Sequence, residues 1–205
     1  MADTVAPEFV RFIAAERKAQ RLAQLPGRGL DEGQVFEPVF VELGQATELL
    51  RVAARRGAGF FRPTQRTEVV WVDGDKELAV GIAGVDIKMT DGLVGIFIPV
   101  RCDQTGPATI QVAFAVGSAN KPGGVFAAAH RRPYGPELIV SVWGEALVAF
   151  AWQCLLGLVS QVAGATGKDA RGNVLVPVEF MADAKGLHIV PMARHRFSGS
   201  SGLKP

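Results

Sequence analysis

The sequence predicts an α+β protein in which a curled antiparallel β-meander packs on one long apolar helix and is preceded by two N-terminal helices. Three observations predict this fold class. Apolar residues follow helical spacing in the first part of the chain, and from residue 67 they alternate with a period of two. Residues 138–160 then form one almost uninterrupted apolar run.

Both N-terminal helices have start and stop signals. The first is expected over residues 6–25, where Pro7 suits the first turn and Pro26 comes directly after the end. The second is expected over residues 42–56, and Gly57 supplies its stop. We therefore expect the chain to enter its sheet from a helical region.

Four strands joined by short turns make up the predicted meander, over residues 67–73, 76–89, 93–103 and 108–117. The apolar phase slips inside the second strand, and a bulge near Ala83 and Gly84 would restore it. Pro99 lacks a backbone N–H for the ladder, so the third strand should lie at an edge or beside a bulge.

The part after the meander is expected to contain a short strand at 137–142, a helix at 144–165 and strands at 174–182 and 187–197. This helix is apolar nearly all round, which is typical of a core helix covered on several sides. Glu145 should belong to its first turn, where a negative charge is favoured. The alternative for Glu145 is a buried acid in a cavity.

The chain is divided by these elements into a helical N-terminal region at 1–62, an α+β core domain at 63–197 and a flexible tail at 198–205. Hydrophobic residues make up 48% of the 205 residues and charged residues 20%, against roughly 25% charged residues in an ordinary soluble domain. Mean hydropathy is +0.21. Surplus apolar side chains must go to an interface, a ligand cavity or lipid, and we expect an interface.

A cytoplasmic location is expected from the cysteines and the N-terminus. Cys102 and Cys154 are the only cysteines, neither belongs to a CxxC pair, and both read as small buried hydrophobes. No secretory signal is visible. The run at 138–160 is long enough to cross a bilayer, but it carries Glu145 and Gln153. A buried helix is therefore preferred, and membrane association is the weaker alternative.

The sequence lacks the motifs of the enzyme classes that are most easily recognised from sequence. The glycines of "GRGLDEG" (27–33) have the spacing GxGxxxG after a helix, which does not fit a dinucleotide fingerprint. His188 and His195 lie seven positions apart, so an unbroken strand would point them to opposite faces. We expect no metal and no cofactor. A net charge of +2 is too small to indicate nucleic acid as a partner, and we expect none.

The best candidate for a binding site is a pair of similar clusters, "HRRPYG" (130–135) and "ARHRF" (193–197). Arginine forks bind carboxylates or phosphates in a bidentate way, and a neighbouring histidine can act as a general acid or base. If a curled sheet brings these ends together, the anion site comprises Lys121, His130, Arg131, Arg132, Tyr134, Arg194 and Arg196, with His130 as the catalytic candidate. The alternative is that these arginines only solvate the ends of apolar strands.

Two function classes remain. The first is a non-catalytic, self-associating or partner-binding module, a subunit of a homo-oligomer or larger assembly, because apolar residues are in excess and catalytic motifs are absent. The second is a small enzyme or ligand-binding domain with a pocket for an anionic small molecule near His130 and Arg131.

Overall fold

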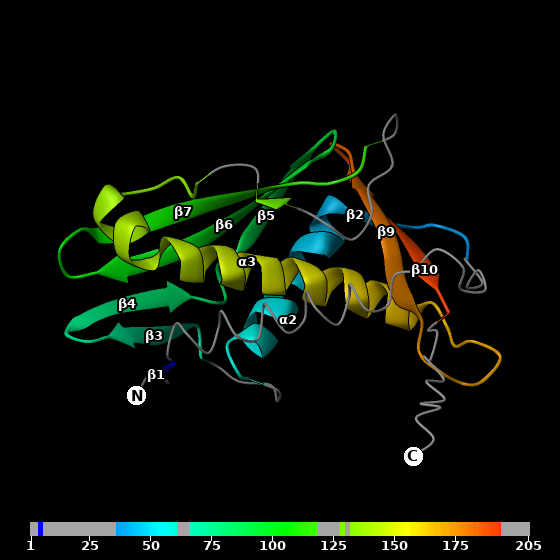
Figure 1. Cartoon of the computed structure of the whole chain (residues 1–205), viewed down its shortest axis with the longest axis horizontal. Coiled ribbons are helices and arrows are strands. Elements are labelled where there is room, and N and C mark those ends of the chain that lie inside the picture. Colours follow the sequence, from blue (N-terminus) through cyan, green and yellow to red (C-terminus); the bar gives the residue numbers. More distant parts are fainter. Residues whose placement is uncertain (1–3, 6–35, 61–65, 119–127, 130–131, 194–205) are drawn as a thin grey trace, which may run out of the picture.

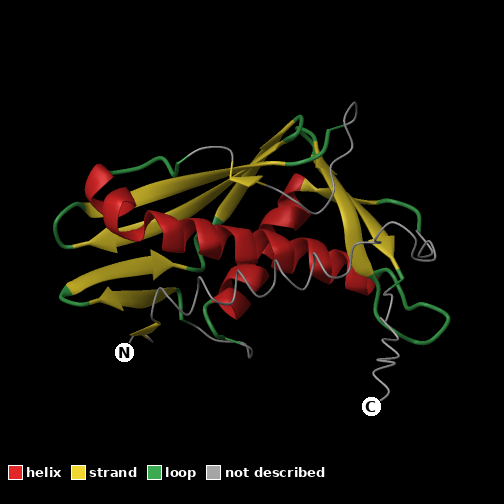
Figure 2. Ribbon diagram, viewed as in Figure 1, coloured by secondary structure: helices red, strands yellow, loops and turns green. Residues whose placement is uncertain are grey.

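The computed structural model describes residues 4–5, 36–60, 66–118, 128–129 and 132–193. Within them the fold is α+β, with two β-sheets and two helices (Figure 1, Figure 2). The long helix α3 (Glu137–Ala165) runs through the middle, with the larger sheet beside its first part and the smaller sheet at its far end. The predicted fold class is confirmed at this level.

The elements follow the predicted order with several changes. The helices are α2 (Leu43–Gly57) and α3 (Glu137–Ala165). The strands are β1 (Thr4–Val5), β2 (Val39–Glu42), β3 (Glu68–Asp73), β4 (Lys76–Gly81), β5 (Asp86–Thr90), β6 (Leu93–Cys102), β7 (Gly106–Ala115), β8 (Ala128–Ala129), β9 (Val176–Ala182) and β10 (Gly186–Met192).

The predicted meander is confirmed. The larger sheet has the order β1-β3-β4-β6-β7-β8, and its pairs are antiparallel except for β1, which runs parallel to β3. Short turns with Gly74 and Gly92 at positive φ connect β3 to β4 and β5 to β6. The apolar positions of β6 and β7 alternate in burial, which places one face of the sheet in the core.

The strand predicted over residues 76–89 is interrupted where its apolar phase slips, and it forms two strands, β4 and β5. β4 and β5 both pair with β6, but residues 81–85 lie opposite only residues 98–99 between the two ladders. Pro99 of β6 occupies this interruption: a Cβ on Gly84 would stand 2.9 Å from Pro99 Cγ, and one on Gly81 3.2 Å from Pro99 Cβ. Pro99 therefore marks a bulge in a central strand, and the edge position is wrong.

The last two strands do not extend the meander. β9 and β10 form a second sheet with β2, in the order β2-β10-β9, and the short strand β2 was not predicted. The parallel bridge between Gly117 and Met181 joins this sheet to the end of β7. The pattern around Val39 is too short to separate a four-residue strand from a loop.

The strand predicted at 137–142 is wrong, because α3 already begins at Glu137. Pro136 is the N-cap residue, and Ile139, Val140 and Trp143 are buried at helical spacing. An all-apolar run of this kind does not distinguish a buried strand from a buried helix, and here the chain continues as one helix of 29 residues. Glu145 consequently lies beyond the first turn and is exposed, so neither the first-turn nor the buried-acid interpretation holds.

α3 is the one helix in the described part of the chain that is long and apolar enough to span a membrane. Its most apolar window is 72% buried inside the protein, which is consistent with the core helix of a soluble protein. Trp71 of β3 packs edge-on against Phe150, with ring centroids 5.7 Å apart, and tilted against Trp143 at 6.3 Å. The sheet thus buries the face of α3 that carries these aromatic rings.

The helix predicted at 42–56 is confirmed as α2, and Arg55 and Arg56 lie in its last turn. Ala46, Leu50 and Ala54 of α2 lie in the same hydrophobic core as α3. The helix predicted at 6–25 and the tail at 198–205 lie outside the described residues. The division into a region 1–62 and a domain 63–197 remains a prediction.

Candidate functional site

A groove lies beside the first turns of α3. Its volume is about 390 Å³, and it is lined by Arg132, Pro133, Val140, Ser141, Gly144, Glu145 and Val148. Four residues of this lining, at 141, 144, 145 and 148, follow helical spacing along one side of α3. The volume falls within the range of roughly 300–1,000 Å³ typical of small-ligand pockets.

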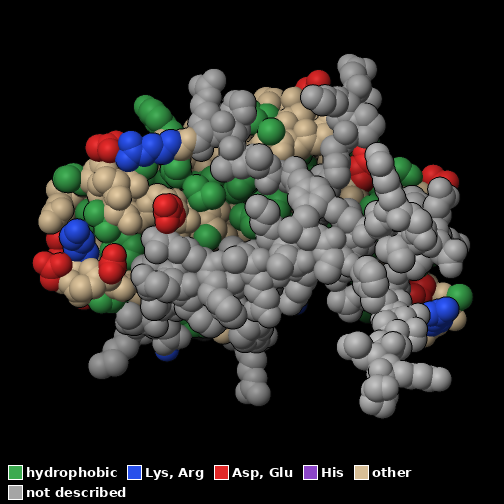
Figure 3. Space-filling view, in the orientation of Figure 1, with side chains coloured by type: hydrophobic (Ala, Val, Ile, Leu, Met, Phe, Trp, Pro, Cys, Tyr) green, Lys and Arg blue, Asp and Glu red, His purple; other side chains and the backbone are tan. Residues whose placement is uncertain are grey.

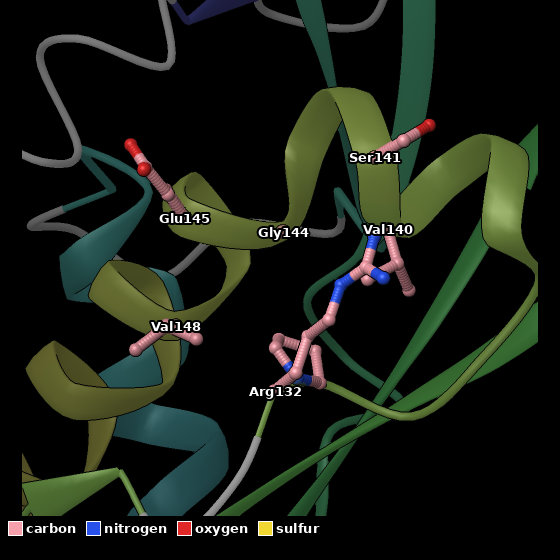
Figure 4. Close-up of a pocket in the computed structure, with 7 residues that line it drawn as sticks. Arg132, Val140, Ser141, Gly144, Glu145 and Val148 are labelled. Atoms are coloured by element: carbon pink, nitrogen blue, oxygen red, sulfur yellow. The ribbon is translucent and has the colours of Figure 1, made fainter.

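Charges of both signs border the groove, which has an apolar wall. Arg132 extends toward Val140, whereas Glu145 projects from α3 away from Arg132 (Figure 4). Val140 is buried, and Gly144 leaves the helix backbone without a side chain between Val140 and Val148. The groove therefore offers one guanidinium beside a small apolar surface.

The Arg132 side chain is held by an ion pair. Its Nη2 donates to Oε1 of Glu137, the first residue of α3, at 2.8 Å. Both side chains are exposed, so this pair adds little stability, but it keeps the guanidinium at the start of the helix. An arginine has five N–H donors, and further donors of Arg132 can therefore bind an oxyanion.

Two large apolar side chains that are close in sequence to the groove residues are exposed to solvent. Tyr134 is 79% exposed and Leu138 is 58% exposed. Tyr134 exchanges two backbone hydrogen bonds with Gln111 of β7, each 2.9 Å long. Figure 3 shows hydrophobic side chains between charged ones over the part of the molecule that holds the start of α3.

Most residues of the predicted anion site lie outside the described residues. These are Lys121, His130, Arg131, Arg194 and Arg196. Arg132 and Tyr134 are described, and both precede α3. The joint site of the two clusters, with His130 as its catalytic candidate, remains a prediction.

The described neighbours of the two clusters lie at opposite ends of α3. Arg132 is bonded to Glu137 at the N-terminal end. Met192, which precedes the second cluster, pairs with Val176, and the adjacent Leu175 lies against Gly164 near the C-terminal end. The helix between Glu137 and Gly164 is about 40 Å long. The structure does not bring Arg132 and Met192 together.

His188 has a carboxylate partner on the smaller sheet. Its Nε2 lies 3.1 Å from Oδ2 of Asp183, and its ring packs against Phe40 with centroids 4.8 Å apart. The hydrogen bond from His188 is the main reason why the pKa of Asp183 lies below its ordinary value, and backbone N–H groups of the turn add to it. His195 lies outside the described residues. Among the described side chains, no three His, Cys, Asp or Glu residues converge as metal ligands would.

Cys102 and Cys154 do not form a disulfide. Cys154 is buried in α3, whereas Cys102 at the end of β6 is partly exposed, which corrects its assignment as a buried residue. The Cys102 Sγ lies 3.1 Å from the Thr105 hydroxyl, and this contact holds the pKa of the thiol below its ordinary value. No histidine accompanies this thiol among its described contacts, so the arrangement lacks the base that a cysteine nucleophile usually has.

The residues missed by the sequence interpretation are Leu138 and the groove wall at Val140 and Val148. They were assigned to a strand or to the apolar body of the helix. A helical reading starting at Glu137 would have placed Ser141, Glu145 and Val148 on one side of α3, where the two polar residues interrupt the apolar surface.

Comparisons with protein families, curated proteins and solved structures found no match for this chain. By its fold and its candidate site, the protein is an α+β domain with a charged, partly apolar groove at the start of its core helix.

Proposed function

We propose that the protein is a non-catalytic binding module that associates with copies of itself through the surface at the start of α3. This surface consists of Tyr134, Leu138 and the ion pair of Arg132 with Glu137. The observation that carries the proposal is the high exposure of Tyr134 and Leu138, four positions apart in the chain.

The composition of this surface matches that of protein interfaces. Tyrosine and arginine are enriched among residues that dominate binding energy, and an apolar centre with a polar rim is the usual arrangement. The excess of apolar residues supports self-association less than the sequence suggested, because most apolar side chains of the described residues are buried in the core around α3. Another protein partner is the alternative occupant, and the cytoplasm is the expected compartment.

The test is the molar mass of the full chain in solution, measured by light scattering over a range of concentrations. We expect an oligomer, and the double variant Tyr134→Ser, Leu138→Glu should shift it toward monomer. Val174→Glu is the matched control, because Val174 is 52% exposed but lies beside Gly164 at the other end of α3. A monomeric wild-type chain, or an oligomer unaffected by the double variant, would contradict self-association through this surface.

The groove supports a second candidate, the binding of an anionic small molecule. The specific observation is a volume of about 390 Å³ with the Arg132 guanidinium at its border and Val140 and Val148 in its wall. A ligand with a carboxylate or phosphate and a small apolar body fits these groups. His130 and Arg131 directly precede Arg132 in the chain, and His130 stays the candidate for any acid–base role.

Thermal stabilisation by inorganic phosphate, nucleotides and small carboxylates tests this candidate. We expect a rise in the unfolding temperature that is lost in Arg132→Gln. Arg101→Gln is the matched control, because Arg101 also forms an exposed ion pair, with Glu68 at 3.3 Å. If no compound raises the unfolding temperature, or if both variants lose the effect equally, the groove does not bind such anions.

A further inference from the structure

The turn between β9 and β10 is the place where the two sheets and α2 meet. Directly before it, Ala182 donates from N to Gly117 O and accepts at O from Gly92 N, both at 3.0 Å. Within the turn, Lys185 O accepts from the backbone N of Leu43, the first residue of α2, at 2.9 Å. A change in this turn therefore acts directly on the larger sheet and on α2.

The Asp183 carboxylate bridges this turn, in addition to the backbone hydrogen bond from Asp183 N to Gly186 O at 3.0 Å. Oδ1 of Asp183 accepts from the backbone N of Lys185 at 2.7 Å and of Gly186 at 3.0 Å. Its other oxygen, Oδ2, lies 3.1 Å from Nε2 of His188 on β10. The Phe40 ring of β2 packs against the imidazole and restrains its orientation. The side chain of Asp183 thus links the backbone of the turn to a titratable ring.

Few other charges compete for His188. Its neighbouring elements carry Glu42 on β2, Glu179 on β9, Lys185 in the turn and Asp91 in the turn between β5 and β6. In the part of the chain that the structure describes, Asp183 is the carboxylate within ion-pair distance of the His188 ring. The side chains of His188 and Asp183 are 37% and 39% exposed, so solvent can deliver and remove the proton.

We propose that Asp183 and His188 form a pH-sensitive latch. When the imidazole takes up a proton, the backbone hydrogen bonds that join the two sheets and α2 at this turn, here called the joint, become more stable. Histidine is the side chain that ordinarily changes charge between about pH 5 and 8. The neutral ring already offers one N–H to the ionised carboxylate, and protonation of the ring adds the attraction between opposite charges to this bond. Asp183 stays ionised in this range, because its pKa is lowered by the same hydrogen bond.

Hydrogen exchange of single amides in the full chain tests the latch. The reporters are the amides of Leu43, Gly92 and Ala182, which cross the joint. After correction for intrinsic exchange, we expect their opening to become roughly two- to fivefold rarer between about pH 7.5 and pH 5.5, as the modest energy of an exposed pair allows. In His188→Gln this pH difference should disappear.

Two further variants keep the test interpretable. Asp183→Asn retains an oxygen for the turn but loses the charge, so its turn should persist without the pH response. Glu68→Gln removes an exposed ion pair with Arg101 that involves no histidine, and it should keep the response. The latch is refuted if the wild-type amides show no pH difference, or if His188→Gln shows the same difference as the wild type.

Discussion

Gly57 and Gln153 lie in contact where α2 crosses α3, and a Cβ added to Gly57 would stand 3.3 Å from Cδ of Gln153. Gln153 is the one fully buried polar side chain among the described residues, at 2% exposure, and its Oε1 has no hydrogen-bond partner. At the end of α2, folding therefore removes the Gln153 amide from water and gives its oxygen no hydrogen-bond partner in exchange.

Replacing Gln153 with methionine should stabilise the protein. An unsatisfied buried acceptor costs about 1–3 kcal/mol, and methionine has a similar length with enough flexibility to fit beside Gly57. We expect the free energy of unfolding, measured with urea, to rise by about 1 kcal/mol or more. A decrease would show that the amide oxygen is satisfied in solution, and Gln153→Glu should be strongly destabilising in either case.

Replacing Gly186 with alanine should destabilise the smaller sheet. A Cβ at this position would collide with the backbone oxygen of Val41 and approach the Phe40 ring to 3.0 Å, so β2 and β10 would have to separate. We expect a loss of about 1–3 kcal/mol or more in the free energy of unfolding.

Gly44→Ala is the matched control for this substitution. Gly44 lies in α2 with a negative φ and no atom within 4 Å of an added Cβ. Its replacement should stabilise the helix by up to about 1 kcal/mol, because alanine loses less backbone entropy on folding. Equal effects of the two substitutions would contradict the steric explanation.

Phe150→Ala should show how much of the stability depends on α3 as a core helix. Phe150 is fully buried and packs edge-on against Trp71. Its truncation should cost about 3–5 kcal/mol, measured by chemical unfolding in buffer without detergent. Ser141→Ala, at an exposed position of the same helix, should change stability by less than about 0.5 kcal/mol. Similar small effects at both positions would contradict the burial of this face of α3.

Acid should destabilise the loop after α3 through Asp169. Its carboxylate accepts from the side chain and backbone of Asn173 and from the backbone N of Arg171, and these bonds hold its pKa below the ordinary 3.8. The stabilisation is fully present above the unfolded pKa and is lost as pH falls through the folded one.

Asp169→Asn should therefore reduce the loss of stability on acidification below about pH 4, measured by urea unfolding at a series of pH values. At neutral pH the same variant should be less stable than the wild type, because the charge-assisted bonds are weakened. An unchanged acid response in Asp169→Asn would show that the carboxylate has the same pKa in the folded and unfolded chain.

The sequence predicted helices and strands best where two independent patterns indicated the same element. The meander was predictable because period-two burial and turn glycines such as Gly74 and Gly92 point to the same strands. α2 was predictable because helical spacing ends at a glycine. At the start of α3 the apolar run had no period, so Ile139 and Val140 fitted a strand as well as a helix.

The candidate site was less predictable, because it depends on contacts between distant segments. The arginine clusters were visible as composition, but the described residues beside them lie at opposite ends of α3. Leu138 could not be recognised as exposed before the direction of α3 was known. The partners of Asp183 were equally hidden, since a turn residue and a strand histidine five positions apart carry no motif.

The sequence by itself determined the order of strands in the meander, the helix that ends at Gly57 and the burial of the long apolar run. These depend on periodicity and on local backbone preferences, which neighbouring residues set. The tertiary structure decided that β9 and β10 form a second sheet with β2, that α3 is continuous from Glu137, and that a groove lies beside Arg132. Those features depend on which apolar faces meet across long stretches of chain, and local patterns do not encode that choice.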